Sequence, residues 1–589
     1  MEDDLKFSIN TSEKDLVTTF QAWMKNSQPY HDELLKYQKI SYEYYIGNQT
    51  ERDFITSNTN TVENRIFEAV ETIVPIVTQK AHQFIVLPGS EDEKSLKRAE
   101  DTQKVITRKY ETMEMQRKLE EITRHMLCYR FGVAKWEWSY EKDDVDVRVV
   151  DPRLILIPRI RMDPHSLPYK IEVQEYTKEE MDEYWPKVKD IAPESFVDVG
   201  KKHEEKRLYR VYECWTSEMV AWFCSNKLLE KQSNPYYDFK GEEKKYIKTT
   251  KKGAKIAKRT VYSNVLDRPT DPYVFFTAYN VGDEPIGSTS LVEVGIPIQD
   301  AINKQKRAII DNLRRMGNGQ VYIDNDAMSK EESDNITDEV GLIIRGEGVA
   351  SQNKIKREAG LPLPGAHFSN LQHSEQVFDN IMGVHGSTRG AGGGKTLGQD
   401  LIARQQDYTR VDLVTRVLNR GVARLALGIV QLMKMFYTEN HVVKIIGEEG
   451  AIEFIRLNKS NIDDYIEIIV KSGESLPMDK MSLRNEAVQL WQLGAIGPVT
   501  LFSRLEFPNP EKAANELVAW KQGQLTAETQ AKIAEIAASS KFAPKTASAT
   551  PGGTPPETSG RDIETPANVI QRATQGLGGT APLTATPNQ

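Results

Sequence analysis

The residues best suited to chemistry lie in a glycine-rich segment, 386–394, which is followed by Lys395 and Thr396. The backbone N–H groups of such a loop can cradle phosphates, as in the P-loop of nucleotide hydrolases. That motif needs a glycine five positions before the one preceding the lysine, and Arg389 stands there instead. The segment also follows an expected helix rather than a strand. The spacing therefore favours a flexible interhelical loop, which could offer Arg389 and Lys395 to a polyanion, over a nucleotide site.

The other groups of reactive residues give even weaker evidence for a metal site or for catalysis. His367 and His373 have no cysteine partner and no suitable carboxylate spacing for a metal. The carboxylates at 143, 144 and 146 fall in an expected hairpin turn, where aspartate is common for reasons of turn geometry. No Gly-x-Ser-x-Gly nucleophile motif occurs. The sequence thus predicts no enzyme, no metal site and no cofactor.

Two basic patterns could meet nucleic acid. One is the run at residues 244–259, which we interpret first as a solvated hairpin and second as a site for DNA or RNA. The other lies on an expected helix from Pro297 to Met316, where four cations sit away from the apolar stripe: Lys304, Arg307, Arg314 and Arg315. They form either an ordinary exposed face or a basic ring, if the subunit repeats around a channel.

The overall charge limits what nucleic-acid contact is possible. The 589 residues include 77 lysines and arginines against 85 aspartates and glutamates, for a formal net charge of −8. Tight coating of nucleic acid needs a basic excess, because counterion release from phosphate drives it. Weak contact by a few cations stays open. The sequence has no run of 18 apolar residues, so we expect no membrane-spanning helix. The three cysteines have neither metal nor disulfide spacing, which is typical of an intracellular protein.

Hydrophobic periodicity predicts an α+β fold. Helices are expected at residues 12–46, 64–84 (kinked or broken by Pro75), 91–129, 297–316, 369–384, 396–437, 479–493, 497–505 and 510–538. Strands are expected as a hairpin over 133–150 and at 170–176, 207–215, 219–229, 320–324, 341–345, 441–446, 451–457 and 465–472, the last three in one sheet. The 297–316 helix carries a packing stripe of Ile298, Ile302, Ile309, Leu313 and Met316. After Lys541 the composition predicts a disordered tail.

The order of these segments resembles the portal proteins of tailed bacteriophages. Four places carry the resemblance: the ending Tyr44-Tyr45-Ile46-Gly47-Asn48-Gln49, the helix from Asn64 to Thr78 with its exit at 86–89, the helix from Ile298 to Arg315, and the helices between Leu476 and Asn509. No single one is diagnostic, but together they span about residues 15–535.

The resemblance implies an elongated subunit of a ring, a dodecamer in this family, around a DNA channel. It implies the following regions: wing 1–289 and 396–472, stem helices 290–316 and 369–385, clip 317–368, tunnel loop 386–395, crown 473–540 and tail 541–589. The tunnel loop, which includes Arg389, Gly390, Gly392, Gly393, Gly394 and Lys395, would approach DNA in the channel.

The function implied is passive. The ring would sit at one capsid vertex, pass double-stranded DNA during packaging and ejection, and dock the terminase large subunit and later a head-to-tail adaptor. Capsid and scaffolding proteins would be further partners, and assembly would take place in the host cytoplasm. Two alternatives stay open: another connector or tail-tube component of a phage particle, and, less favoured, a P-loop ATPase whose turnover would depend on Lys395.

Overall fold

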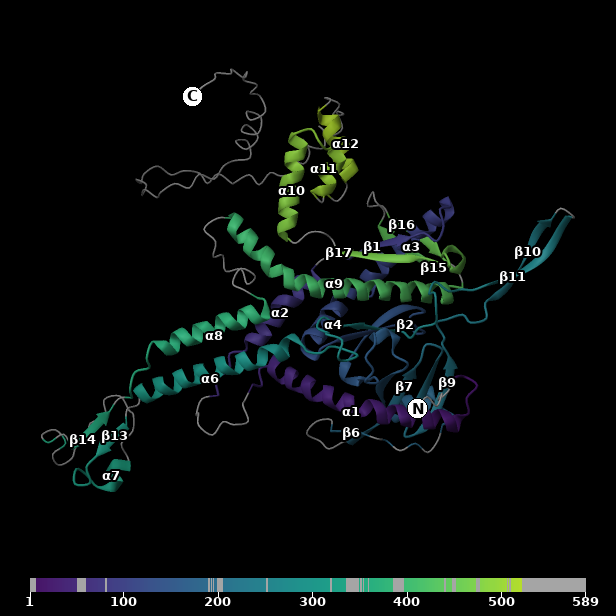
Figure 1. Ribbon diagram of the computed structural model, residues 1–589. Coiled ribbons are helices and arrows are strands. Elements are labelled where there is room, and N and C mark those ends of the chain that lie inside the picture. Colours follow the sequence, from purple (N-terminus) through teal and green to yellow (C-terminus); the bar gives the residue numbers. More distant parts are fainter. Residues whose placement is uncertain are drawn as a thin grey trace, which may run out of the picture. The chain divides into compact units, whose positions relative to one another are not determined.

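The computed structural model describes most of the chain. The described ranges are 7–49, 60–79, 82–188, 195–198, 205–250, 253–317, 320–334, 354–358, 360–384, 397–438, 441–446, 452–472, 477–505 and 510–521, with a few single residues between them. The chain divides into two units, Met1–Ala514 and Asn515–Gln589. The second contributes the end of helix α12 (Pro510–Lys521) to the described residues. The account below concerns the first unit, a mixture of helices and strands (Figure 1).

The N-terminal helix covers the largest sheet. Helix α1 (Glu13–Tyr45) begins at Ser12, whose side chain accepts a hydrogen bond from the Asp15 N–H. It buries Leu16 and Phe20, and the Phe20 ring stacks on Phe223 at 4.4 Å between centroids. The sheet order is β4-β5-β7-β8-β9, with β6 also on β7. Its strands are β4 (Ile155–Leu156), β5 (Lys170–Tyr176), β6 (Ser195–Asp198), β7 (Glu205–Trp215), β8 (Met219–Cys224) and β9 (Lys227–Ser233).

The main core joins segments distant in sequence. Helix α9 (Leu397–Phe436) packs on the three-stranded sheet β12-β2-β3, made of β2 (Gly132–Ser139), β3 (Asp144–Val150) and β12 (Tyr273–Phe276). Gly428 permits the close approach, because a side-chain carbon there would lie 2.5 Å from the Trp136 ring. The buried side chains of α9, which include Val414, Leu418 and Leu425, therefore belong to the same hydrophobic cluster as side chains of β2 and β3.

Two expected helices differ from the structure, one at its end and one in its middle. Helix α2 (Arg65–Thr78) continues through Pro75 but stops at Thr78, and His82–Leu87 forms strand β1 instead of continuing it. The helix expected over 91–129 is two helices, α3 (Glu93–Thr112) and α4 (Met115–Tyr129). They part at Glu114, whose φ of 52° is left-handed. Both bury residues in one core, so the apolar period runs across the break and hides it.

The last three strands do not form one sheet as expected. Strand β15 (His441–Ile446) pairs with β16 (Ile452–Leu457), whereas β17 (Glu467–Ser472) pairs antiparallel with β1. The run 219–229 is likewise split into β8 and β9, because Ser225 and Asn226 both have positive φ. Helices α10 (Pro477–Gln492) and α11 (Pro498–Arg504) follow at the expected positions. The expected strand 341–345 and the tail 541–589 lie outside the described residues.

A buried charge cluster ties the two larger sheets together. Lys135 Nζ lies 2.6 Å from Glu213 Oε1, and Arg148 donates to both carboxylate oxygens of Glu172 at 2.7 and 3.1 Å. Tyr273 Oη donates to Glu172 at 2.8 Å. Burial alone would raise the pKa of Glu172, but the charges of Lys135 and Arg148 outweigh it and hold that pKa at about 2.

We expect Glu172→Gln to lower the free energy of unfolding by about 3 kcal/mol, because it removes the bidentate partner of Arg148 and one of the two carboxylates beside buried Lys135. Glu175→Gln is the matched control on the same strand, since its exposed pair with Arg210 contributes at most about 1 kcal/mol. The folded pKa lies below the unfolded value, so Glu172 stabilises the fold above about pH 5 and less as pH falls toward 2. Urea unfolding at pH 7 and pH 4 checks both points, and equal effects of the two substitutions would contradict them.

Candidate functional site

The candidate site is built on two paired helices. Helix α6 (Leu291–Gly317) packs along α8 (Ala366–Met382), and between them the chain forms β13 (Gln320–Ile323), α7 (Lys330–Asp334) and β14 (Ile355–Glu358) (Figure 1). Helix α6 begins earlier than expected, so Pro297 lies inside it. Ser290 caps this start, with its Oγ accepting from the Glu293 N–H at 3.1 Å, a capping signal that the sequence reasoning missed.

The expected packing stripe of α6 is buried at one end and exposed at the other. Ile302 is fully buried, Ile298 packs against the core and Ile309 is half-buried. Leu313 is 56% exposed and Met316 37% exposed. The subunit therefore covers the base of the stripe with its own residues and leaves the apolar end uncovered.

The four predicted cations of α6 do not share one environment. Lys304, Arg314 and Arg315 are exposed. Arg307 is 2% exposed, and its Nε donates to Thr61 O at 2.9 Å while Nη2 donates to Gln49 O at 3.3 Å. Arg307 is therefore not an exposed cation of this subunit, because its guanidinium donates to backbone carbonyls inside the fold.

A buried chain of hydrogen bonds fixes α6 to the segment between α1 and α2. Asn303 Nδ2 donates to Gln49 Oε1 at 2.8 Å, and Gln299 Nε2 donates to Glu63 O at 2.7 Å. In return, the N–H groups of Glu63 and Arg65 donate to Asn303 Oδ1 and Gln299 Oε1, both at 3.2 Å. Losing one partner would leave a buried polar group unsatisfied, at about 1–3 kcal/mol.

An ion network extends this junction to α8. Arg65 Nη2 lies 2.9 Å from Asp379 Oδ1 of α8. Lys306 of α6 pairs with Glu375 of α8 at 3.2 Å and also with Glu63. The two helices and the segment before α2 thus share one set of charges. We call this set and the hydrogen-bonded chain above the stem junction (residues 49, 63, 65, 299, 303, 306, 307, 375 and 379).

The turn after α1 supplies the opposite side of the stem junction. Gly47 has φ +85°, and a side-chain carbon there would lie 3.3 Å from Asn64 Nδ2. Asn64 donates to Tyr45 O at 2.8 Å, accepts from Gln49 Nε2 at 2.9 Å and caps α2. The Tyr-Tyr-x-Gly ending therefore closes the turn that presents Gln49 to α6.

Sequence reasoning singled out the right helix but missed most of the junction. Gln299, Asn303 and Arg307 recur every four residues, so one helical face carries three polar side chains. That spacing was the available signal. Their partners lie more than 230 residues away in sequence, and no periodicity reports such a distance.

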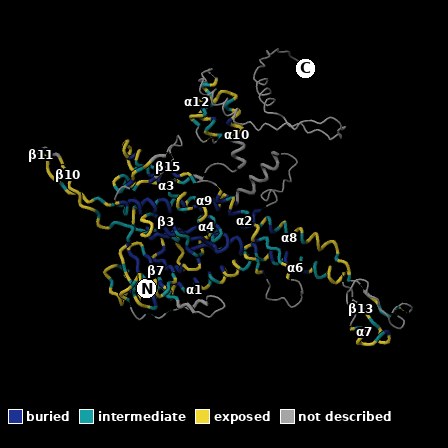
Figure 2. The backbone as a smooth tube through the Cα atoms, turned by 180° about the vertical axis from the view of Figure 1, so that it is seen from behind, coloured by how far each residue is buried: buried dark blue, intermediate teal, exposed yellow. Residues whose placement is uncertain are grey.

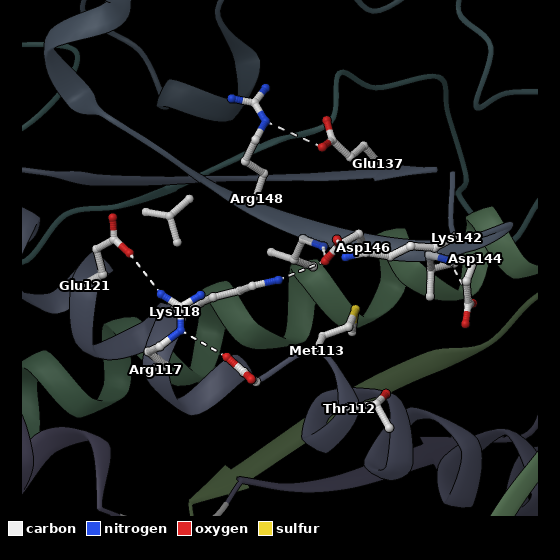
Figure 3. A pocket seen from close by; sticks show the side chains of 14 residues that line it. Thr112, Met113, Arg117, Lys118, Glu121, Glu137, Lys142, Asp144, Asp146 and Arg148 are labelled. Carbon is white, nitrogen blue, oxygen red and sulfur yellow. Dashed lines mark hydrogen bonds and ion pairs between the residues drawn. The ribbon is translucent and has the colours of Figure 1, made fainter. Parts of the chain in front are cut away.

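The carboxylate cluster of the β2–β3 hairpin lines a pocket but is occupied by cations of the protein (Figure 3). Asp146 accepts from Lys118 at 2.8 Å and from Lys142 at 2.6 Å, and Asp144 pairs with Lys109. Asp143 lies in the turn itself, with φ 47°. Among the described residues, no group of three or more His, Cys, Asp or Glu side chains could hold a metal ion.

The glycine-rich segment 386–395 lies outside the described residues. Its described neighbours are α8, which ends at Met382, and α9, which begins at Leu397. The segment thus comes after a helix, as the sequence predicts, and not after the buried strand that a P-loop requires. The three cysteines are free and buried. None of the helices in the described ranges is long and apolar enough to cross a membrane.

Comparison with known proteins identifies the family. The family model "Phage P22-like portal protein" matches residues 21–549. This chain therefore belongs to the P22-like phage portal proteins, a structural and non-enzymatic family, and is a portal protein of the phage type and a component of a virion.

Two further comparisons add little to that assignment. The fold is similar to a chain in the solved virion of a native gene transfer agent particle, with a TM-score of 0.38 and 11% identity, over 78% of this chain and 89% of that one. No curated protein matches the sequence. The assignment therefore rests on the family match.

We expect Gly47→Ala to destabilise the protein more than Gly282→Ala does. Both glycines have φ near +85°, so each alanine pays about 1 kcal/mol of backbone strain. Gly282 has nothing within 4 Å of an added carbon, whereas Gly47 faces Asn64 of the stem junction. Thermal unfolding of both variants measures the difference, and equal shifts in midpoint would show that Asn64 is indifferent to the added carbon.

Proposed function

We propose that the chain assembles into a closed ring, a dodecamer by resemblance to its family, which forms a channel for double-stranded DNA at one capsid vertex. The match to the portal family over residues 21–549 carries the proposal. The uncovered apolar side chains Leu313 and Met316 support it, because exposed apolar surface of this kind is typical of an interface. Neighbouring subunits in the ring would cover them.

The regions of the subunit follow from the same proposal. The wing is 1–289 with 396–472, the stem is α6 and α8 within 290–316 and 369–385, and the clip is 317–368. The crown is 473–540 and the tail 541–589. The stem junction supports the division, because it holds both stem helices on the N-terminal wing helices through α2 and the turn after α1.

We expect only a few cations to contact DNA in the channel. We assign this contact to the tunnel loop 386–395, through Arg389 and Lys395, and to Lys304, Arg314 and Arg315 on the stem. Glycines give the loop the backbone freedom to follow a moving duplex. An acidic subunit with few cations toward DNA lets the duplex slide, because phosphate contacts set the strength of nonspecific binding.

The ring acts without catalysis of its own. Terminase, docked at the clip, supplies ATP hydrolysis during packaging, and a head-to-tail adaptor takes its place later. Capsid and scaffolding proteins surround the ring in the virion, and assembly proceeds in the host cytoplasm before the particle is complete.

The ring is tested by negative-stain electron microscopy of the purified protein. We expect particles with a central hole, and we expect Leu313→Asp/Met316→Asp to reduce their number at least tenfold at equal concentration. Ala308→Asp, an exposed position on the same helix, is the control and keeps the rings. A monodisperse monomer for the unmodified protein, under both dilute and crowded conditions, would contradict the proposal.

The tunnel loop is tested by deleting residues 389–394. Rings should persist by microscopy, while nuclease-protected DNA per capsid falls, because the loop that follows the duplex is shortened. Packaging and retention at the level of the unmodified protein would refute this assignment of the loop and leave the ring proposal intact.

A further inference from the structure

The basic run at residues 244–259 forms a two-stranded ribbon, which has no role in the proposed DNA channel. Strand β10 (Glu242–Thr250) pairs antiparallel with β11 (Gly253–Val261), and the two form a sheet of their own. Nine residues per strand span about 30 Å. Figures 1 and 2 show the ribbon standing apart from the other labelled elements of its unit, and its described residues are mostly exposed.

The pairing register sorts its side chains into two faces. Ile247 stands directly opposite Ile256, and Lys245 opposite Lys258, all on one face. The other face carries two cation pairs, Lys244 opposite Arg259 and Lys248 opposite Lys255. Three of the cross-strand pairs therefore join like charges.

Such a ribbon is poorly stabilised by itself. Like charges directly opposite each other destabilise a strand pair, and a lone two-stranded hairpin is marginal in water. Lysines on open strand edges do prevent unwanted pairing, which gives the cations an ordinary explanation. That explanation does not extend to Ile247 and Ile256, which are 72% and 75% exposed at the middle of the ribbon.

The base of the ribbon is rigidly mounted. Asp238 and Asn264, just outside the two strands, exchange hydrogen bonds of 2.9 Å. Gln431 of α9 donates to Asn264 Oδ1 at 3.1 Å, and Lys459 pairs with Glu242 at 2.8 Å. An anchored arm with an apolar centre is suited to contact another molecule at a fixed position.

We propose that the β10–β11 ribbon is an arm that packs, through its Ile247–Ile256 face, on the surface of a second copy of this chain. The proposal rests on the ring under "Proposed function", which places copies side by side, and adds an intersubunit contact outside the stem.

Charge complementarity favours a second copy as the occupant. Residues 242–261 hold eight cations and two acids, a net +6, so the remaining chain of net −8 carries −14. A copy offers acidic surface with apolar content. Helix α5 (Lys178–Tyr184), for example, exposes four carboxylates, one lysine and the Tyr184 ring.

Duplex DNA is the competing ligand, because a basic β-ribbon also fits the major groove. Phosphates would neutralise the cations, but they offer no apolar surface to the isoleucine pair. The two faces together therefore favour a protein surface, and DNA becomes an outcome of the test.

Site-specific photo-cross-linking distinguishes the two. Because the native cysteines are buried, a maleimide–benzophenone reagent labels an introduced Ile256→Cys selectively. We irradiate the full-length ring fraction with a tenfold excess of a 30-base-pair duplex present. The expected product has twice the subunit mass, and it is absent when the same protein is diluted to monomers before irradiation.

Loss of the apolar pair provides the second measurement. Ile247→Ser/Ile256→Ser should raise the concentration at which half of the subunits are in rings at least tenfold, whereas Thr260→Ser, at an exposed position on the same face, should not. Rings by microscopy with product of single-subunit mass, or cross-linking to the duplex instead, would overturn the arm proposal and leave the ring standing. If the unmodified protein forms no rings, both proposals fall.

Discussion

The stem junction is the constraint on which the rest of this subunit depends. Helices α6 and α8 extend from the core, and Leu313 and Met316 near the far end of α6 are exposed. Their direction is therefore set at the base. There Gln299, Asn303 and Arg307 bond to backbone and side chains between α1 and α2, and Arg65 bonds to Asp379. Arg130 adds a bidentate pair with Glu293 at 2.7 Å.

A junction made of buried hydrogen bonds and ion pairs holds α6 and α8 in one fixed orientation. Apolar packing tolerates sliding, whereas buried hydrogen bonds and ion pairs are satisfied in one arrangement and costly in others. The proposed ring would need that specificity, because every copy would have to place its helix pair identically. The buried cluster around Glu172 has the same character in the two larger sheets, where it joins β2 and β3 to β5 and β7.

The structure shows which cations of this acidic chain lie inside the fold and which are exposed. Arg307, which the sequence offers as a cation for DNA, is hydrogen-bonded inside the fold, and its neighbour Lys306 pairs with Glu375. Other cations are exposed, among them Lys304, Arg314 and Arg315 on α6 and the lysines of the ribbon. In the proposed channel, an acidic subunit that holds some of its cations inside the fold would bind DNA only weakly, because phosphate contacts set the strength of nonspecific binding.

Much of the secondary structure could be predicted from local patterns, and the errors have local causes. The β2–β3 hairpin, α9 and the α6–α8 pair follow from periodicity. The break at Glu114 was hidden because the apolar stripe runs across it, and β17 was assigned to the wrong sheet because strand partners depend on distant segments. The junction was missed for the same reason: its partners come together only in the fold. Which residues would line the proposed channel depends on the geometry of the ring, and no local pattern in the sequence reports that geometry.

The most direct test of the central claim is a cryo-electron microscopy reconstruction of the assembled protein. We expect a closed, rotationally symmetric ring in which α6 and α8 lie next to the central opening, Leu313 and Met316 are buried between subunits, and Arg307 still bonds within its own subunit. A ring with the α6–α8 pair on its outer rim, or an open filament, would contradict it.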